Sequence, residues 1–166
     1  YHPFPLLEEP KVEEAAKLIN ESKKPLLLVG HGVMISKAQS ELLELAEKAG
    51  IPMASTLLGL SAVPNKHPQY VGMLGMHGNY GPNVKTNECD LLIAVGMRFD
   101  DRVTGDLNTY AKQAKVIHIE IDPAEVDKNV KTDVAIVSDA KAALLALNKL
   151  VNENSHDEWL EEFRVC

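Results

Sequence analysis

Glycine-rich segments that also carry histidine or arginine are the parts of this sequence best suited to ligand chemistry. Gly30-His31-Gly32 is the first of them, and glycines recur at positions 72, 75, 78 and 81 around Met76-His77. A third segment, residues 96–102, holds two arginines and two aspartates. Glycine allows a backbone to approach a ligand closely, and arginine can bind a phosphate or carboxylate through two N–H groups. These segments together predict a site for a nucleotide-like ligand.

A catalytic acid–base pair is not evident in these segments. Asp100 and Asp101 are adjacent and point different ways, and the flanking Arg98 and Arg102 favour ion pairing on a solvated loop. Neither His31 nor His77 has an acid partner that the sequence identifies, so ligand packing is the favoured role for both. His118 lies within an apolar run, which indicates a structural role. We therefore predict no catalytic residue in this chain.

Two common nucleotide-binding fingerprints are missing. A standard NAD site requires a third glycine and an acid about 20 residues further on. Ile35 occupies the third glycine position, and residues 51–58 contain no acid. The lysine pattern of a phosphate-binding P-loop is also absent. A free-standing NAD-dependent enzyme is therefore disfavoured.

The elements that must position these segments alternate between strand and helix patterns. Short apolar runs predict strands at residues 26–29, 51–55, 71–74, 91–95, 116–121 and 134–137. Apolar residues at helical spacing predict helices that begin at Pro10, near residue 37 and at residue 140, and residues 80–88 are compatible with another. Ser36 and Gln39 have the spacing of a capping box, and Ser138 or Asp139 is expected to cap the last helix.

This alternation predicts an α/β fold in which right-handed crossovers join parallel strands and helices cover both faces, as in a Rossmann-like domain. In an open parallel sheet, ligands bind beyond the carboxyl ends of the strands. The glycine-containing segments follow the predicted strands, so we expect them to converge at one edge. Helix starts after such loops would offer free N–H groups to a phosphate.

Length and charge narrow the functional classes. The 166 residues suffice for one domain, and a net charge of −7 disfavours nucleic acid as a partner. No apolar run approaches the roughly 20 residues of a membrane helix. Cys89 and Cys166 form no metal-type spacing, and we expect a reducing, cytoplasmic compartment.

The two ends of the chain suggest a piece of a longer protein. The sequence opens with Tyr1 rather than methionine and stops within a charged, helix-like run. Early prolines predict a linker over residues 1–9. We expect the domain proper over residues 10–152 and the start of a C-terminal linker or helix over residues 153–166.

Several motifs carry a resemblance to a known family. The segments at 72–78 (Gly-Met-Leu-Gly-Met-His-Gly) and 95–105 (Val-Gly-Met-Arg-Phe-Asp-Asp-Arg-Val-Thr-Gly) resemble the large, catalytic subunit of acetolactate synthase, also called acetohydroxyacid synthase. Residues 56–60 (Thr-Leu-Leu-Gly-Leu) and 118–123 (His-Ile-Glu-Ile-Asp-Pro) extend the similarity over almost the whole chain. The chain is similar to the central domain of that three-domain family.

The resemblance implies a six-stranded parallel sheet that carries FAD in a largely structural role. It implies a parent enzyme that uses thiamine diphosphate and Mg²⁺ to condense pyruvate with a second 2-oxo acid in branched-chain amino acid biosynthesis. The glycine–aspartate–glycine signature for thiamine diphosphate has no match here, so the chain alone is expected to be inactive. A homo-oligomer with a possible small regulatory subunit is the implied assembly, with no nucleic acid and no membrane as partners.

The same resemblance implies which residues contact FAD. The family usually has a small residue where this chain has His31, so a larger side chain borders the implied flavin site. The implied cofactor-binding residues are Gly30, His31, Gly32, Thr56, Leu57, Leu58, Met73, Leu74, Gly75, Met76, His77, Gly96, Met97, Arg98, Asp100, Arg102, Glu120, Ile121, Ser138 and Asp139.

Two alternatives stay open. The chain could be the central domain of a related thiamine-diphosphate enzyme, such as glyoxylate carboligase, pyruvate oxidase or pyruvate decarboxylase, although the motifs at 76–78 and 98–102 favour acetolactate synthase. It could also be a non-catalytic scaffold with an empty pocket that mediates assembly. The first alternative keeps a cofactor site, and the second predicts no flavin.

Overall fold

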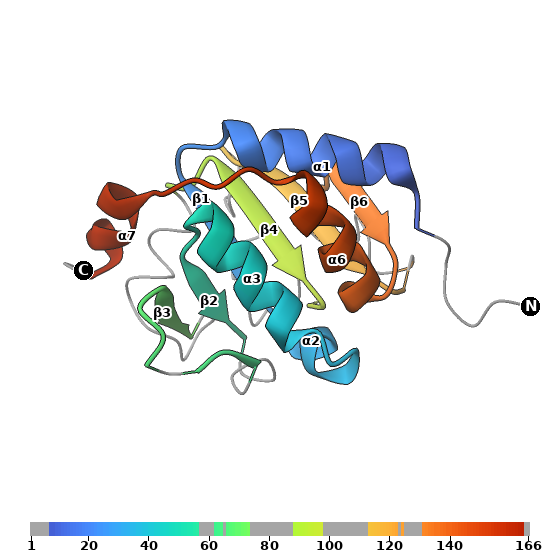
Figure 1. Ribbon diagram of the computed structural model, residues 1–166, viewed down its shortest axis with the longest axis horizontal. Coiled ribbons are helices and arrows are strands. Elements are labelled where there is room, and N and C mark those ends of the chain that lie inside the picture. Colours follow the sequence, from blue (N-terminus) through green and yellow to red (C-terminus); the bar gives the residue numbers. More distant parts are fainter. Residues whose placement is uncertain are drawn as a thin grey trace, which may run out of the picture.

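A six-stranded parallel sheet organises the chain. The computed structural model describes residues 7–56, 62–64, 66–73, 88–97, 113–122, 124 and 131–164, and Figure 1 shows the arrangement of its strands and helices. All neighbouring strands are parallel, in the order β3-β2-β1-β4-β5-β6. The strands are β1 (Pro25–Val29), β2 (Met53–Ser55), β3 (Tyr70–Met73), β4 (Leu91–Val95), β5 (Lys115–Glu120) and β6 (Val134–Val137). The α/β prediction is therefore confirmed.

The central strands are apolar at successive positions because both of their faces are covered. Every residue of β1 and β4 is buried, which is the pattern of a parallel strand between two layers. The six predicted strands are all present, with ends that shift by one or two residues. β2, for example, begins at Met53 rather than at Ile51.

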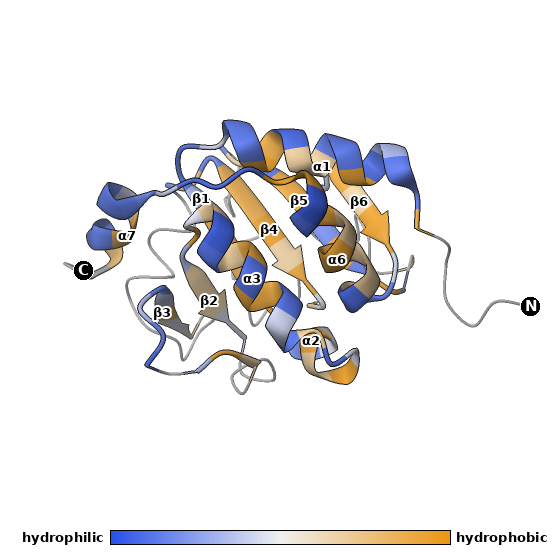
Figure 2. Cartoon of the chain, viewed as in Figure 1, coloured by the Kyte–Doolittle hydropathy of each residue, from blue (hydrophilic) through white to orange (hydrophobic). Residues whose placement is uncertain are grey.

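One face of the sheet carries three longer helices. These are α1 (Glu9–Glu21), α3 (Gln39–Ala49) and α6 (Ala140–Leu150), and α6 contacts both of the others. Figure 1 shows α3 and α6 in front of the strands. Their apolar stripes, which include Val12, Leu42 and Leu144, join alternate strand residues in the larger buried cluster. Figure 2 shows polar and apolar residues alternating along these helices.

The opposite face carries a smaller apolar cluster that includes Leu26, Leu28 and Leu92. Trp159 and Phe163 from α7 (Asp157–Arg164) pack into this cluster, with 3% and 6% of their surfaces exposed. Helices therefore lie on both faces, as predicted. The helix-like run at the end of the sequence is indeed a helix, and its tryptophan is docked in the core.

The predicted capping box at Ser36 and Gln39 is wrong. Residues 31–35 form a short helix, α2 (His31–Ile35), which ends at Ser36. Lys37 adopts a left-handed conformation with φ of 56°, and the chain reverses there before α3 begins at Gln39. Ala38 occupies the cap position, without a side-chain hydrogen bond. Ser36 instead forms the C-terminal cap of α2, where its N–H donates to Gly32 O at 3.0 Å.

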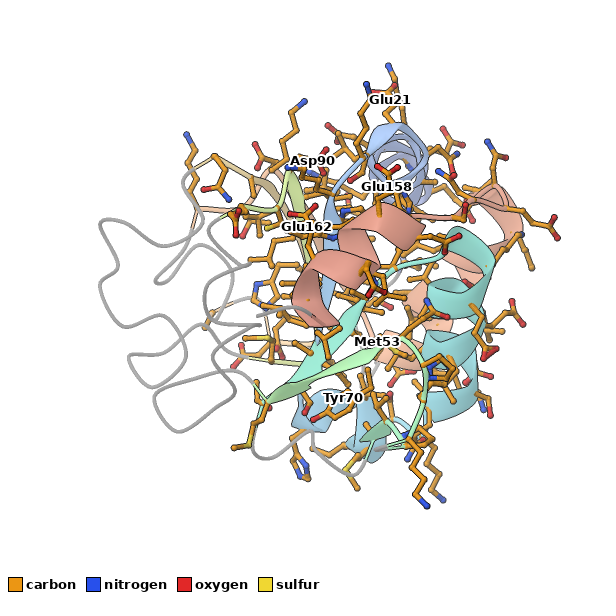
Figure 3. The ribbon with its side chains drawn as sticks, turned by 90° about the vertical axis from the view of Figure 1, so that its left-hand side faces the viewer. Glu21, Met53, Tyr70, Asp90, Glu158 and Glu162 are labelled. Atoms are coloured by element: carbon orange, nitrogen blue, oxygen red, sulfur yellow. The ribbon has the colours of Figure 1, made fainter. Side chains whose placement is uncertain are left out.

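Residues 151–164, which we call the strap, cross the amino edge of the sheet and end in α7. Its Asn154 N–H donates to Lys48 O at 2.9 Å. The His156 ring lies 3.1 Å from Gly50 O and 3.0 Å from Ser22 O, and Trp159 Nε1 donates to Pro25 O at 2.6 Å. Figure 3 shows Glu158 and Glu162 of α7 at the same end as Asp90 and Glu21. The strap thus joins the ends of α1 and α3 to the start of β1.

Candidate functional site

The carboxyl ends of the six strands form one continuous edge, which we call the carboxyl edge. Their register aligns Val29 with Ser55 and Val95, Ser55 with Met73, and Val95 with Ile119. The described site candidates follow these positions directly, from Met73 at one side to Asp139 at the other. The predicted convergence of these segments is therefore present in the part of the chain that the structure describes. They are Gly30, His31, Gly32, Thr56, Met73, Gly96, Met97, Glu120, Ile121, Ser138 and Asp139.

The other candidates lie outside the described residues. They are Leu57, Leu58, Leu74, Gly75, Met76, His77, Arg98, Asp100 and Arg102. The predicted helix over residues 80–88 lies almost entirely outside them as well. The described part of the candidate site therefore consists of the exits of β1, β4, β5 and β6, together with the last residues of β2 and β3.

At the centre of the carboxyl edge, the exits of β1 and β4 pack backbone against backbone. Gly32 N donates to Gly96 O at 2.8 Å, and Gly30 N donates to Val95 O at 2.9 Å. A Cβ atom on Gly32 would lie 2.7 Å from the Gly96 Cα, and one on Gly30 would lie 2.3 Å from the Met97 Cβ. Gly96 also has a φ of +63°. The close contact between the two turns is sufficient to explain why glycine occupies all three positions.

This packing fills the point where the strand order reverses. The chain winds outward from β1 to β3 on one side and from β4 to β6 on the other, and a ligand crevice is expected between such halves. Here the β1 and β4 exits touch each other, so backbone closes the space between these two strand ends. His31 is exposed at the start of α2, directly after this junction.

The helix starts at this edge use some of their own N–H groups internally. In the first turn of α2, Val33 N donates to Gly30 O at 3.2 Å, while Gly32 N is bound to Gly96 O. At the start of α6, the Asp139 carboxylate accepts from Ala142 N at 3.4 Å, which confirms it as the capping residue. These particular amides are engaged within the chain, in contrast to the expected free N–H groups.

The β5 exit is built around Glu120. One oxygen of its carboxylate, Oε1, accepts hydrogen bonds from the Ile121 and Asp122 N–H groups, at 3.1 and 3.2 Å. The Ile121 side chain beside it is 39% exposed, one of the few large apolar side chains on the described surface. Ser138 is buried, and its N–H donates to Glu120 O at 3.1 Å. The edge therefore offers an acidic acceptor next to an apolar surface.

His118 is the residue whose involvement the sequence analysis missed. It is buried, as a structural role requires, but its Nε2 lies 2.8 Å from the Met97 carbonyl oxygen in the β4 exit. It also precedes Glu120 by two positions, which places both residues on the same face of β5. The sequence did contain a signal for this role, because His118 and the candidate acid Glu120 stand two positions apart in a predicted strand.

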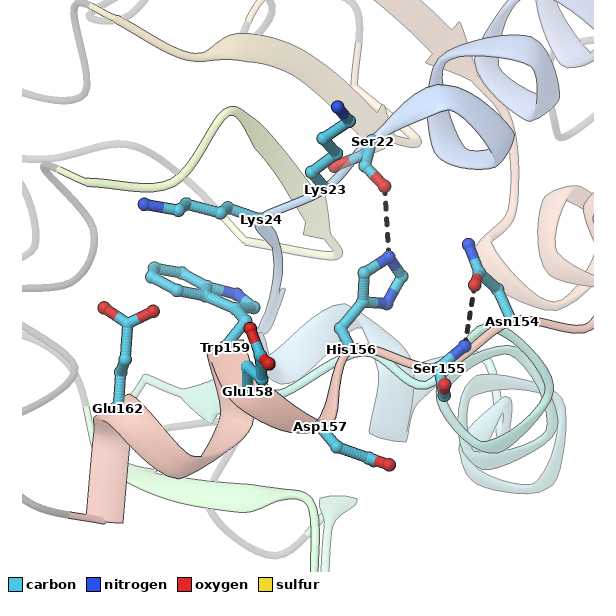
Figure 4. A pocket seen from close by; sticks show the side chains of 10 residues that line it. All are labelled: Ser22, Lys23, Lys24, Asn154, Ser155, His156, Asp157, Glu158, Trp159 and Glu162. Carbon is cyan, nitrogen blue, oxygen red and sulfur yellow. Dashed lines mark hydrogen bonds between the residues drawn. The ribbon is translucent and has the colours of Figure 1, made fainter.

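Away from the carboxyl edge, an open hollow of about 460 Å³ lies at the amino edge. Figure 4 shows Lys24, His156, Trp159 and Glu162 around it. The Lys24 Nζ lies 5.7 Å from the centre of the Trp159 ring. The hollow borders the strap and is remote from the predicted site residues.

Two features are absent from the described residues. No group of three or more histidine, cysteine, aspartate or glutamate side chains there is arranged to hold a metal ion. None of the described helices combines the length and apolar character that crossing a bilayer requires.

Comparison with known proteins places the chain in a family. The family described as "Thiamine pyrophosphate enzyme, central domain" matches residues 12–147. A probable acetolactate synthase large subunit from Methanocaldococcus jannaschii is 51% identical over 158 residues, covering 91% of this chain and 26% of that protein. An acetolactate synthase from Mycobacterium avium is 47% identical over 154 residues, covering 93% of this chain and 25% of that protein.

The chain thus spans about a quarter of the length of these curated relatives. The matched residues include every described strand and the helices α2 and α3, together with most of α1 and α6. The parallel sheet and this match both indicate the same α/β fold. The chain belongs to the family of thiamine pyrophosphate enzyme central domains.

Proposed function

We propose that this chain is the central domain of an acetolactate synthase and that it holds FAD along its carboxyl edge in a structural role. The similarity to curated acetolactate synthases, at about half of the aligned positions, is the observation that carries the proposal. The parent would condense pyruvate with a second 2-oxo acid in branched-chain amino acid biosynthesis. Thiamine diphosphate and Mg²⁺ would be bound outside this domain, so the chain alone would be inactive.

The residues at the β5 exit suit the adenosine end of FAD. An exposed apolar side chain at Ile121 can cover one face of a purine ring, and the adjacent Glu120 carboxylate can accept hydrogen bonds from ribose hydroxyl groups. Thr56, Met73 and the β1 and β4 turns would border the rest of the dinucleotide. Arg98 and Arg102 would provide the positive charge that the phosphates need.

These residues would bind and orient the cofactor, and none would transfer a proton. In this proposal the flavin stays bound as a structural group and does not carry the net reaction. The parent would act in the cytoplasm as a homo-oligomer, with a small regulatory subunit as a possible partner. The division into a linker at 1–9, a domain at 10–152 and a C-terminal segment from 153 is part of the same proposal.

FAD titration of the purified chain tests the cofactor part directly. We expect saturable quenching of flavin fluorescence, a rise in melting temperature with FAD concentration, and competition by ADP. NAD serves as the control, because the NAD fingerprint is missing, and should not compete. Changing Arg98 to alanine should weaken binding. An absence of saturation up to about 1 mM FAD, where binding contributes only about −4 kcal/mol, would refute autonomous FAD binding.

An assembly scaffold without cofactor is the second candidate. It is favoured by the close packing of Gly30 and Gly32 against the β4 exit, because those glycines then need no ligand to explain them. This alternative predicts no flavin binding together with a dimer at micromolar concentration. Sedimentation with and without FAD distinguishes it from the first proposal.

A carboligase assay addresses the expected inactivity. The isolated chain, supplied with pyruvate, thiamine diphosphate and Mg²⁺, should form no acetolactate above a blank without protein. Measurable product would show that the catalytic groups are present in this chain, contrary to the proposal.

A further inference from the structure

His118 makes a hydrogen bond whose direction can be assigned. Its ring is fully buried within β5, and Nε2 lies 2.8 Å from the Met97 carbonyl oxygen. A carbonyl oxygen can only accept, so Nε2 must carry the proton and donate. The Met97 interaction therefore sets one protonated position of the imidazole. A buried ring without this partner would carry the full cost of its desolvation.

The acceptor of this bond belongs to the turn that leads out of β4. Backbone bonds hold the same turn from two sides: Gly96 N donates to Ile119 O at 2.9 Å, and Gly96 O accepts from Gly32 N at 2.8 Å. His118 adds a side-chain donor one residue further along, at Met97. Because a peptide unit is planar, holding the Met97 carbonyl restricts the direction in which the chain leaves β4. Arg98, a candidate phosphate ligand, is the next residue in the sequence.

A second contact links the same imidazole to the β5 exit. Glu120 Oε2 lies 4.0 Å from His118 Nε2. The other oxygen of that carboxylate accepts from the Ile121 and Asp122 N–H groups. The Glu120 side chain is only 11% exposed, so solvent weakens these contacts less than it would at the surface. The same ring nitrogen thus faces both the Met97 carbonyl and the carboxylate that organises the next loop.

We propose that His118 is a positioning residue of the carboxyl-edge site, which fixes the β4 exit relative to Glu120 and thereby sets the affinity for a dinucleotide. The inference rests on the proposed function for the identity of the ligand, but the positioning itself does not require a ligand. A purely space-filling role for His118 predicts that any side chain of similar size would serve equally well. The two roles differ in their dependence on a donor at Nε2.

Three variants separate these roles. His118→Gln places an amide nitrogen at the same number of bonds from the backbone and can still donate to Met97 O. His118→Leu fills the space without a donor. Val116→Ala is the matched control, since Val116 is buried on the same face of the same strand, two positions earlier and away from the carboxyl edge. Each variant is compared with wild type for melting temperature, FAD affinity and amide exchange in the β4 and β5 exits.

We expect His118→Leu to weaken FAD binding about tenfold, as the loss of one buried hydrogen bond implies, and to increase amide exchange at residues 96–98 and 121–122. His118→Gln should recover most of the affinity. Val116→Ala should lower the melting temperature through lost burial and leave FAD affinity within about twofold of wild type, because it removes no donor to Met97 O. Unchanged affinity and exchange in His118→Leu would overturn the proposal.

A measurement without FAD keeps the inference separate from the proposed function. In the labelled wild-type chain, scalar coupling between the His118 Nε2 and the Met97 carbonyl carbon should report the hydrogen bond directly. Its absence would overturn the positioning role, even if His118→Leu failed to fold. If the coupling and the exchange changes are present but wild type does not bind FAD, then only the proposed cofactor is wrong.

Discussion

The most demanding test of the fold is the replacement of Trp159 by phenylalanine. The Trp159 ring is 3% exposed, its Nε1 donates to Pro25 O at 2.6 Å, and its centre lies 5.0 Å from that of Phe163 in an edge-to-face arrangement. Phenylalanine keeps an aromatic ring in the cluster but removes the donor and part of the buried area. The substitution therefore tests whether the strap is an integral part of the fold.

Two contributions set the expected loss of stability. The smaller ring buries roughly 40 Å² less apolar surface, which costs about 1 kcal/mol at about 25 cal/mol per Å². The Pro25 carbonyl, at the start of the buried strand β1, loses its donor, which costs about 1–3 kcal/mol more. A total of about 2–4 kcal/mol corresponds to a fall of roughly 5–15 °C in melting temperature for a chain of this length.

Thermal and urea unfolding followed by circular dichroism measure this loss. Glu153→Ala, an exposed substitution in the strap, is the control and should change stability by less than about 0.5 kcal/mol. Because Trp159 is the single tryptophan of the chain, its fluorescence in wild type reports the strap alone. That transition should coincide with the one seen by circular dichroism. A fall of less than about 2 °C in Trp159→Phe, or an earlier fluorescence transition, would refute the reasoning.

Three further predictions concern the two edges of the sheet. Gly32→Ala should destabilise the chain by about 1–3 kcal/mol in urea unfolding, because the added Cβ would lie 2.7 Å from the Gly96 Cα. A variant as stable as wild type would mean that the β1 and β4 exits are not packed as described. Asp139→Ala should cost about 0.5–2 kcal/mol through loss of the α6 cap, and Asp139→Asn, which can still accept, should recover most of it; equal losses in both would exclude the cap as the cause. Burial, with a contribution from the charge of Asp90, raises the pKa of the Cys89 thiol from 9.0 to about 12. Since the unfolded thiol ionises first, the stabilisation that Cys89 provides is complete below pH 9 and declines as the pH rises toward 12. Relative to Cys89→Ala, wild-type stability should fall by about 1.4 kcal/mol per pH unit above pH 9, and a constant difference between the two would contradict the buried thiol.

The secondary structure was largely predictable because its signals are local. Apolar runs such as 26–29 and 91–95 are the pattern of strands buried on both faces, and both runs lie within observed strands. Helix α6 begins where Asp139 can cap it, as the sequence predicted. The prediction failed at residues 31–38, where the reversal at Lys37 separates two helices. That reversal depends on how α2 and α3 pack, which a capping pattern does not encode.

The sequence by itself determined the alternation of strands and helices, the apolar faces that join them and, through its motifs, the family. It also identified which segments follow the strands, and a parallel sheet then brings the carboxyl ends of those strands to one edge. Only the tertiary structure decided which residues of distant segments contact one another at the edges of the sheet. Gly32 meets Gly96, His118 meets Met97, and Trp159 meets Pro25 across 64, 21 and 134 positions of sequence. Such contacts depend on strand order and register, and no local pattern of residues specifies them.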